Sequence, residues 1–552
     1  MQTLNIDLWP CKDTSSLCSK KVAYLSMEVA VDQVLKTYSG GLGFLAGSHL
    51  KSTHALKQNV IGISLLWTYG YYTQNRAGNR DMRVDFIQHG YSFLQDTGIL
   101  LKVNVHDHEV LVKVLLLPPE TFETSPIFFL TTDIPENDPI SRTITYRLYD
   151  SNMSTRIAQS ILLGIGGARL IECLKEDVEC FHLNEGHGLP VAYELYAKYR
   201  KVDEVRKRLV FTTHTPELAG NEEHETNLLH EMGFFGQLSR EEGERISLST
   251  NGRLNYTLAA LRLSRKANGV SQKHGLVARQ MWQGNLGICP IISITNAQNK
   301  HYWVDKQLEQ AFQQGDEEGL ARRKKELKAQ LFRLVADQTG KLLDPDVLTI
   351  VWARRLAGYK RESLILYELD RFKQLVNREK DPIQVIWAGK PYPEDQGGIS
   401  TFNYLEKVTQ DLPRCAVLIG YDLELSAQLK KGADLWLNTP RLTREASGTS
   451  GMTAAMNGTI NCSVQDGWVP EFARHGQNGF YLPLPTQPLS QEKQDWEDHL
   501  HLLEVVERDI IPMYYAHPDQ WRRIMKTAMA DIYPAFDSDR MANEYYEKLY
   551  TR

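Results

Sequence analysis

Four cationic side chains lie within eight residues at the end of an apolar, β-branched segment. The segment is 347–352, and the cations that follow it are Arg354, Arg355, Lys360 and Arg361. Arginine makes paired hydrogen bonds to phosphate oxygens, and lysine adds a point charge. We interpret Arg354, Arg355 and Lys360 as phosphate ligands. A salt-bridged surface loop is the alternative interpretation of the same residues.

A second run, Glu445 to Gly458, combines an acid with small residues and leads into a helical pattern. Small residues let backbone amides approach an anion at the start of a helix. Thr449, Ser450 and Gly451 are therefore candidates for phosphate contacts. Glu445 could accept hydrogen bonds from sugar hydroxyls, although an acid that only caps the helix is the plainer alternative.

Two further runs carry polar groups with a weaker chemical signal. The glycine-rich segment 38–47 includes Gly40 and Gly41, whose amides could approach a donor phosphate, but a tight turn explains it equally. The runs 182–187 and 211–216 contain histidine and glutamate, including His214. Their spacing matches no familiar zinc motif, so we expect no metal and favour hydrogen bonds to a sugar.

Short apolar runs alternate with helical patterns along the whole chain, which is the rhythm of a parallel sheet. This predicts an α/β fold of two doubly wound halves facing a central cleft, with ligands at the carboxyl ends of the strands. We expect an N-terminal Rossmann-like domain over 1–295, a C-terminal one over 296–520 and a helical segment over 521–552. The expected strands are 22–25, 61–66, 180–183, 209–212, 347–352, 383–387, 416–419 and 435–437.

Two helices are indicated by apolar residues at helical spacing. One lies within 305–335 and contains the basic cluster 322–325, which we interpret as a solvated helix face rather than a polyanion site. The other begins near Trp521, and its apolar stripe to Ile532 is typical of a packed core.

Composition restricts the classes of function. The chain has 552 residues, 42% hydrophobic and 24% charged, which is too long for one core. A net charge of −5 gives no reason to expect nucleic acid, and we expect no membrane span and no signal peptide. The seven cysteines lack Cys-x-x-Cys spacing, so we expect free thiols in the cytoplasm, although Cys11 and Cys18 or Cys173 and Cys180 could pair.

As a set, these motifs closely resemble the α-glucan (glycogen, starch and maltodextrin) phosphorylase family, and the length resembles its short bacterial branch. The resemblance covers nearly the whole chain and implies the GT-B fold and retaining transfer of a hexosyl group. It also allows a homodimer. The runs that carry it are 24–28, 38–47, 163–167, 182–187, 212–216, 268–271, 353–361, 445–458, 466–468 and 544–546.

The resemblance implies a role for each matching position. Arg355 and Lys360 match ligands of the substrate phosphate, and Arg354 matches a lysine near the phosphate of the cofactor, pyridoxal phosphate (PLP). The other matches are Gly41 in the loop over the donor phosphate, His214 and Asn296 at the sugar 6-position, Glu445, Ser447 and Gly448 at its 2-, 3- and 4-positions, Thr449 and Ser450 at the PLP phosphate, and Trp303 and Tyr421 lining the PLP pocket.

The sequence departs from the family at the residue that carries the cofactor. Thr453 stands where the family has the lysine that holds PLP as a Schiff base, and threonine has no amine to form one. Covalent PLP is therefore not expected, although noncovalent PLP stays open. Residues 297–299 read Ala-Gln-Asn where the family usually has Gly-Val-His, which suggests altered cleft walls.

Three functions remain from the sequence. The first is a PLP-independent retaining glycosyltransferase that uses a nucleotide sugar and a carbohydrate or other hydroxyl acceptor, because anion and sugar ligands persist while the cofactor anchor is lost. The second is a true phosphorylase acting on glucan and phosphate to give glucose 1-phosphate. The third is a catalytically silent carbohydrate-binding protein.

Overall fold

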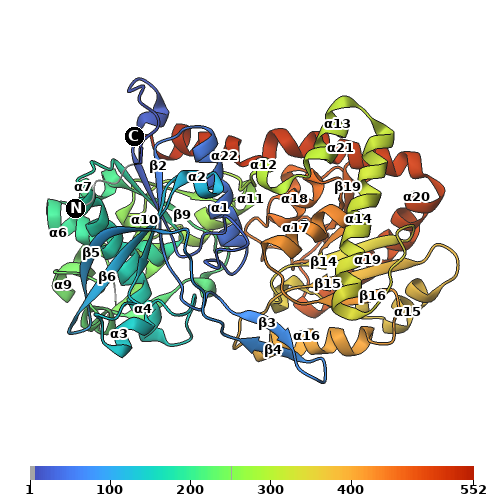
Figure 1. Cartoon of the computed structure of the whole chain (residues 1–552), viewed down its shortest axis with the longest axis horizontal. Helices are drawn as coiled ribbons and strands as arrows, with labels where there is room; N and C mark the ends of the chain where they lie inside the picture. Colours follow the sequence, from blue (N-terminus) through green and yellow to red (C-terminus); the bar gives the residue numbers. More distant parts are fainter. Residues whose placement is uncertain (1–5, 250, 552) are drawn as a thin grey trace. The chain divides into compact units, whose positions relative to one another are not determined.

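The computed structural model describes residues 6–249 and 251–551 and divides into two compact units. The first unit comprises 1–72, 86–299 and 538–552, and the second comprises 73–85 and 300–537 (Figure 1). This division departs from the expected boundaries at two places. The hairpin of β3 and β4 belongs to the second unit, and the segment expected at 521–552 is shared, because its helix α21 stays with the second unit.

A sheet of nine strands forms the centre of the first unit, in the order β13-β12-β9-β8-β1-β2-β7-β6-β5. Its pairs are parallel from β13 to β7, while β6 pairs antiparallel with β7 and with β5. The strands are β1 Val22–Ser26, β2 Val60–Leu65, β5 Gln95–Val105, β6 His108–Leu117, β7 Ile127–Thr131, β8 Cys180–Asn184, β9 Leu209–Thr212, β12 Lys266–Gly269 and β13 Ile291–Ser293, with a separate pair of β10 Glu223–Glu225 and β11 Arg253–Asn255.

Helices cover this sheet, and α22 packs beside α1, as the red and blue ribbons in Figure 1 show. The helices are α1 Gly41–Ala55, α2 Pro119–Phe122, α3 Pro139–Thr143, α4 Met153–Ile161, α5 Gly167–Leu174, α6 Val191–Tyr199, α7 Val202–Arg208, α8 Thr226–Glu231, α9 Arg240–Ser247, α10 Tyr256–Leu263, α11 Gln272–Trp282 and α22 Ser538–Glu544.

The second unit is built on six parallel strands in the order β16-β15-β14-β17-β18-β19. These strands are β14 Leu348–Ala353, β15 Ile383–Ala388, β16 Cys415–Leu418, β17 Leu435–Asn438, β18 Ile460–Ser463 and β19 Gly479–Tyr481, and the hairpin adds β3 Thr73–Arg76 and β4 Met82–Asp85. The helices are α12 Lys300–Trp303, α13 Lys306–Gln314, α14 Glu317–Thr339, α15 Leu369–Asn377, α16 Gln396–Thr409, α17 Leu423–Gly432, α18 Ser450–Met456, α19 Gln491–Val505, α20 Ile511–Ala516 and α21 Pro518–Phe536.

The parallel sheets confirm the α/β fold predicted from the sequence. Every strand expected from an apolar run is present, and each carries a fully buried pattern, as strands covered on both faces require. The stripe from Trp521 to Ile532 is buried on α21, as predicted for a packed helix.

The basic cluster 322–325 is only in part the solvated face that the sequence suggested. Arg322 and Lys325 are exposed, but Arg323 pairs with Asp305 at 2.8 Å. The Lys324 ammonium donates to the carbonyl oxygens of Lys431 and Ala433 at 2.8 Å and of Asn457 at 3.1 Å, and to Thr459 Oγ1 at 2.8 Å. One lysine thus ties α14 to the chain that leaves α17 and the chain that leaves α18.

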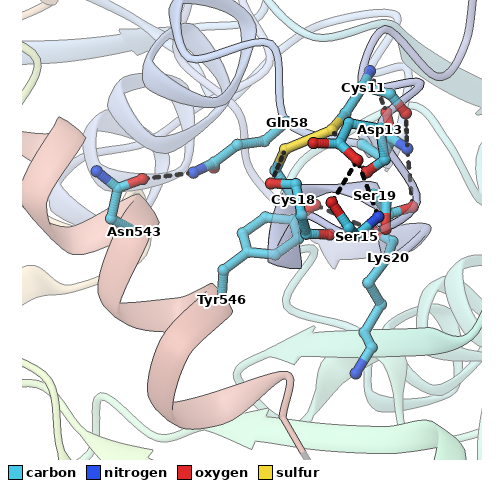
Figure 2. Close-up of a disulfide and its surroundings, with 11 residues drawn as sticks. Cys11, Asp13, Ser15, Cys18, Ser19, Lys20, Gln58, Asn543 and Tyr546 are labelled. Atoms are coloured by element: carbon cyan, nitrogen blue, oxygen red, sulfur yellow. Dashed lines mark hydrogen bonds between the residues drawn. A yellow bond between two sulfur atoms is a disulfide. The ribbon is translucent and has the colours of Figure 1, made fainter.

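The cysteine prediction is wrong for one pair. Cys11 and Cys18 form a disulfide, with Cα atoms 6.2 Å apart (Figure 2). The sequence analysis favoured free thiols because it expected a reducing compartment and found no Cys-x-x-Cys spacing. The turn that brings Cys11 and Cys18 within disulfide reach is visible only in the fold. Cys173, Cys180, Cys289, Cys415 and Cys462 are free. Beside the disulfide, Gln58 Nε2 donates to Asn543 Oδ1 at 2.8 Å.

One helical stretch meets the length and apolarity of a membrane span, which the sequence analysis had not anticipated. It runs over Met153–Leu174 with a mean hydropathy of 1.4, and 78% of its most apolar window is buried inside the protein. A core helix of a globular domain has these same properties.

We predict that Lys324→Met lowers the free energy of unfolding by about 2–3 kcal/mol, because the carbonyl oxygens of Lys431 and Asn457 lose their donor and that of Ala433 keeps the Thr459 hydroxyl. Chemical denaturation followed by circular dichroism measures this change. Lys325→Met is the matched control, since Lys325 is exposed and pairs with the exposed Asp346, and it should change stability by less than about 0.5 kcal/mol. Equal effects of the two variants would contradict the anchoring role of Lys324.

Candidate functional site

Arg354 is a buried cation directly after β14. Its Nη2 donates to Ser450 Oγ at 3.2 Å, but its Nε is buried and has no hydrogen-bond partner among the described residues. Burial disfavours its charged form and lowers the pKa of its guanidinium. An unsatisfied buried donor costs about 1–3 kcal/mol, so Arg354 is placed to receive an acceptor from outside the protein.

Glu445 lies between two of the predicted phosphate ligands. Its carboxylate pairs with Lys360, and its Oε2 is 3.8 Å from Arg354 Nη1. Burial opposes ionisation of this carboxyl, but the charges of Lys360 and Arg354 outweigh burial and lower its pKa below the ordinary value. The acid expected to bind sugar hydroxyls therefore also neutralises two of the cations, while Arg355 lies exposed on the same loop.

The loop that carries Glu445 is held by the segment 466–468. Asp466 Oδ2 accepts from the Glu445 amide at 2.9 Å, and the Trp468 amide donates to the Ser447 carbonyl at 3.1 Å. A Cβ on Gly467 would lie 2.1 Å from that carbonyl oxygen, and its φ of +60° also favours glycine. Ser447 and Gly448 thus have a fixed place beside Glu445, and Thr449 and Ser450 follow into α18.

Arg361, the last cation of the cluster, has a structural position. Its guanidinium pairs with Asp495 at 2.9 Å and with Asp498 at 2.7 Å, and it donates to the carbonyl oxygens of Thr439 and Pro440 at 2.9 Å. These contacts use its donors inside the unit. The cluster therefore divides into one anchor, Arg361, and three cations that surround Glu445 or face solvent.

The predicted cofactor pocket contains a lysine that the sequence analysis missed. Trp303 is 1% exposed, and the Lys430 ammonium lies 3.9 Å from the centroid of its indole ring. The Tyr421 hydroxyl donates to the Ala353 carbonyl at 3.1 Å, next to Arg354. Thr453 is fully buried, and its hydroxyl donates to the Ser450 carbonyl of its own helix at 3.0 Å.

In the first unit, the polar residues of the predicted sugar set lie at the carboxyl ends of the parallel strands. His214, two residues after β9, contacts Asn184 Oδ1 through its Nε2 at 2.7 Å, and its amide donates to Glu185 Oε2 at 2.7 Å. Burial lowers the pKa of His214 to about 3, so its ring is neutral at physiological pH. Asn296 lies after β13 and is buried, with no partner for its Oδ1 among the described residues.

Glu185 belongs to the run 182–187, for which the sequence analysis favoured hydrogen bonds to a sugar without singling out this residue. It follows β8 with φ +70° and ψ 172°, a conformation that is essentially restricted to glycine. Burial raises the pKa of its carboxyl to about 7. Strained backbone and a raised pKa at a strand end are typical of functional sites, and the strain could not be read from the residue types.

The glycine-rich loop is arranged differently from the prediction for Gly40. The Glu28 carboxylate accepts from the Ser39 amide at 2.7 Å and from the Gly40 amide at 3.2 Å, and Tyr149 donates to it at 2.7 Å. A buried carboxylate thus already uses the Gly40 amide, whereas Gly41 begins α1 and is exposed. Of the two glycines, only Gly41 is placed to approach a phosphate.

Residues 297–299 tie elements of the first unit together. Gln298 Oε1 accepts from Ser48 of α1 at 2.9 Å, and its carbonyl accepts from the Ser538 amide at 3.0 Å. Asn299 Nδ2 donates to Ser52 Oγ at 2.9 Å. Residues 297–299 therefore hold α1 and α22 through hydrogen bonds, which is a structural role beyond that of a substrate-site wall. Among the described residues, no group of three His, Cys, Asp or Glu side chains could hold a metal ion.

Comparison with known proteins identifies the family. The model of the carbohydrate phosphorylase family matches residues 253–482. The maltodextrin phosphorylase of Thermococcus litoralis is 31% identical over 592 residues, which span 96% of this chain and 70% of that protein. The chain belongs to the carbohydrate phosphorylase family.

Two other members extend this relationship. The glycogen phosphorylase of Aquifex aeolicus is 29% identical over 612 residues, which span 97% of this chain and 86% of that enzyme. An uncharacterised protein of Methanocaldococcus jannaschii is 45% identical over 537 residues, which span 96% of this chain and all of that protein. Membership confirms the resemblance seen in the motifs and makes this chain a phosphorylase-like glycosyl-transfer protein.

We predict that the stability of Glu185→Gln relative to the wild type rises with pH between about 4.5 and about 7. The folded wild type holds the Glu185 proton more tightly than the unfolded chain does, so its stability falls as pH rises through this window. Above pH 7 the variant should be the more stable protein by about 1–3 kcal/mol. Denaturant titrations at several pH values measure the difference. The exposed Glu231→Gln is the control, and a pH-independent difference for Glu185→Gln would contradict the raised pKa.

Proposed function

We propose that this protein transfers a hexosyl group, with retention, between an α-1,4-linked glucan and phosphate, forming glucose 1-phosphate. The observation that supports this function best is the buried Nε of Arg354, which has no acceptor among the described residues, on a side chain that lies beside the Lys360–Glu445 pair. The printed names of the maltodextrin and glycogen phosphorylases, each aligned over most of this chain, support glucan and phosphate as substrates. The GT-B arrangement expected from the sequence is part of this proposal.

Each residue set has a role in this proposal. Arg355 and Lys360 hold the substrate phosphate, and Arg354 holds a second phosphate, that of PLP or an anion in its place. Positive charge around the departing or attacking phosphate stabilises the transition state, in which the sugar has oxocarbenium character. Glu445, Ser447 and Gly448 would contact the sugar hydroxyls from the second unit. In the first unit, His214, Asn296 and Glu185 form a separate polar set that is suited to hydrogen bonds with a sugar.

A second candidate function is supported by Thr453. Because position 453 cannot form an imine, the second phosphate could be the distal phosphate of a nucleotide sugar, and the protein would then be a PLP-independent hexosyltransferase. The two candidates share the cations and the sugar set. They differ in the group that lies near Trp303 and Tyr421.

A product assay separates the candidates. Purified protein is incubated with maltoheptaose and phosphate, with and without PLP, and separately with maltoheptaose and UDP-, ADP- or GDP-glucose. Glucose 1-phosphate in the first reaction supports the phosphorylase function, and a released nucleoside diphosphate with an elongated glucan supports the second candidate. Neither product would contradict both and favour a protein that binds carbohydrate without turnover.

We predict that Arg355→Ala weakens binding of glucose 1-phosphate by about tenfold or more, because it removes a charged, bidentate contact to phosphate. Isothermal titration calorimetry measures the dissociation constant. Arg322→Ala is the control, because Arg322 is an exposed arginine of the same unit in α14, and it should leave the affinity unchanged. Unchanged affinity in Arg355→Ala would remove Arg355 from the phosphate site.

A further inference from the structure

Lys430 is a buried amine at the end of α17. Its residue is 2% exposed, and its ammonium lies over the face of Trp303, which is itself almost fully buried. The Lys430 carbonyl accepts from Thr459 Oγ1 at 2.6 Å, and the next carbonyl in the chain accepts from Lys324. The backbone that carries this amine is therefore fixed by hydrogen bonds.

The Lys430 amine and position 453 lie on elements of the second unit that pack against each other. The Asn457 side chain donates to the Trp303 carbonyl at 3.0 Å and to the Thr453 carbonyl at 2.8 Å, which joins α12 to α18. Helix α17 packs against α18 in turn. Thr453 directs its hydroxyl back to its own helix, so Lys430 on the adjoining helix supplies an amine that Thr453 does not.

Burial of Lys430 shifts its equilibrium towards the neutral, nucleophilic amine, whereas the Trp303 face attracts the ammonium form. Burial, and after it the charges of Arg354 and Lys431, lower the pKa of Lys430 well below that of an ordinary lysine. A lysine that is desolvated and close to another cation is the kind that forms imines with carbonyl compounds. Contact with an indole face adds an apolar wall that a flat ring could share.

The neighbouring charges indicate that the carbonyl compound also carries a phosphate. Arg354 influences the charge state of Lys430, and its buried Nε has no hydrogen-bond partner among the described residues. A buried guanidinium with an unsatisfied donor is stabilised by an anion. PLP is a planar aldehyde with a phosphate ester. Its aldehyde could react with the Lys430 amine, its ring could pack on the Trp303 face, and its phosphate could accept from the Arg354 guanidinium.

We propose that Lys430 forms an imine with the aldehyde of PLP and replaces the lysine that the family has at position 453. The neutral Nζ attacks the aldehyde carbon, a C=N bond replaces the C=O bond, and the oxygen leaves as water with both protons of the amine. The phosphate ester is held by Arg354. This inference goes beyond the proposed function, because imine formation requires neither glucan nor turnover.

The test is reductive trapping on the full-length protein. PLP is added, absorbance is followed for the imine, and borohydride converts the C=N bond to a stable secondary amine by delivering hydride to carbon. Intact mass and peptide mapping then locate the pyridoxyl group. We expect one group per chain, on Lys430.

Three variants give the test its controls. Lys430→Met keeps the volume but loses the amine, and Lys430→Arg keeps the charge but cannot form the imine, so both should reduce trapping by about tenfold or more. Lys325→Met removes an exposed lysine of the same unit and should trap PLP as the wild type does. The wild-type peptide map needs no variant to fold.

Each outcome is decisive for Lys430. A label on another lysine, such as Lys324, or PLP that binds without being trapped, would overturn the proposal. Absence of PLP binding while glucose 1-phosphate still binds would overturn it and leave the phosphate site in place. A label on Lys430 without glucose 1-phosphate formation would support the imine and contradict the proposed function.

Discussion

Buried positive charge at the carboxyl end of β14 is the constraint on which the candidate site depends. Arg354 and Lys360 are each less than a tenth exposed, and the Glu445 carboxylate pairs with both. Removing charges from water is costly unless they are paired. A site in which two buried cations share one carboxylate favours the binding of a further anion. Phosphate matches the planar donors of arginine. Donor binding and stabilisation of a phosphate leaving group then follow from the same feature.

The surrounding structure keeps these cations in place through contacts that have no chemical role of their own. Arg361 fastens the loop after β14 to α19 through two aspartates, and Asp466 fastens the loop before α18. Lys324 holds the ends of α17 and α18 from a third helix. Because a buried charge is costly when its partner moves away, the anchors that keep the cations beside Glu445 are as necessary to the site as its ligands.

The sequence predicted the parts of the fold that depend on local pattern. Runs such as 416–419 are apolar over their whole length, as a strand buried on both faces requires. The cations after β14 were also predictable, because a strand end and its loop are adjacent in the chain. The separation of Arg361 from the other cations was not predictable, since its aspartate partners lie more than 130 residues away along the chain.

Lys430 shows the same limit most clearly. In the sequence it is one of two lysines at the end of an ordinary amphipathic helix, and nothing local distinguishes it from Lys431. Its position over Trp303 depends on how α12, α17 and α18 pack. Glu185 is similar, because its strained backbone is visible only in three dimensions. The disulfide of Cys11 was missed because compartment, rather than geometry, guided the expectation.

The most direct test of this account is a crystal structure of the protein with inorganic phosphate and PLP. The account predicts a phosphate group within hydrogen-bond distance of Arg354 Nε, in a pocket bordered by Lys430 and Trp303. A structure in which Arg354 Nε bonds to a protein group, and phosphate binds elsewhere or nowhere, would contradict it.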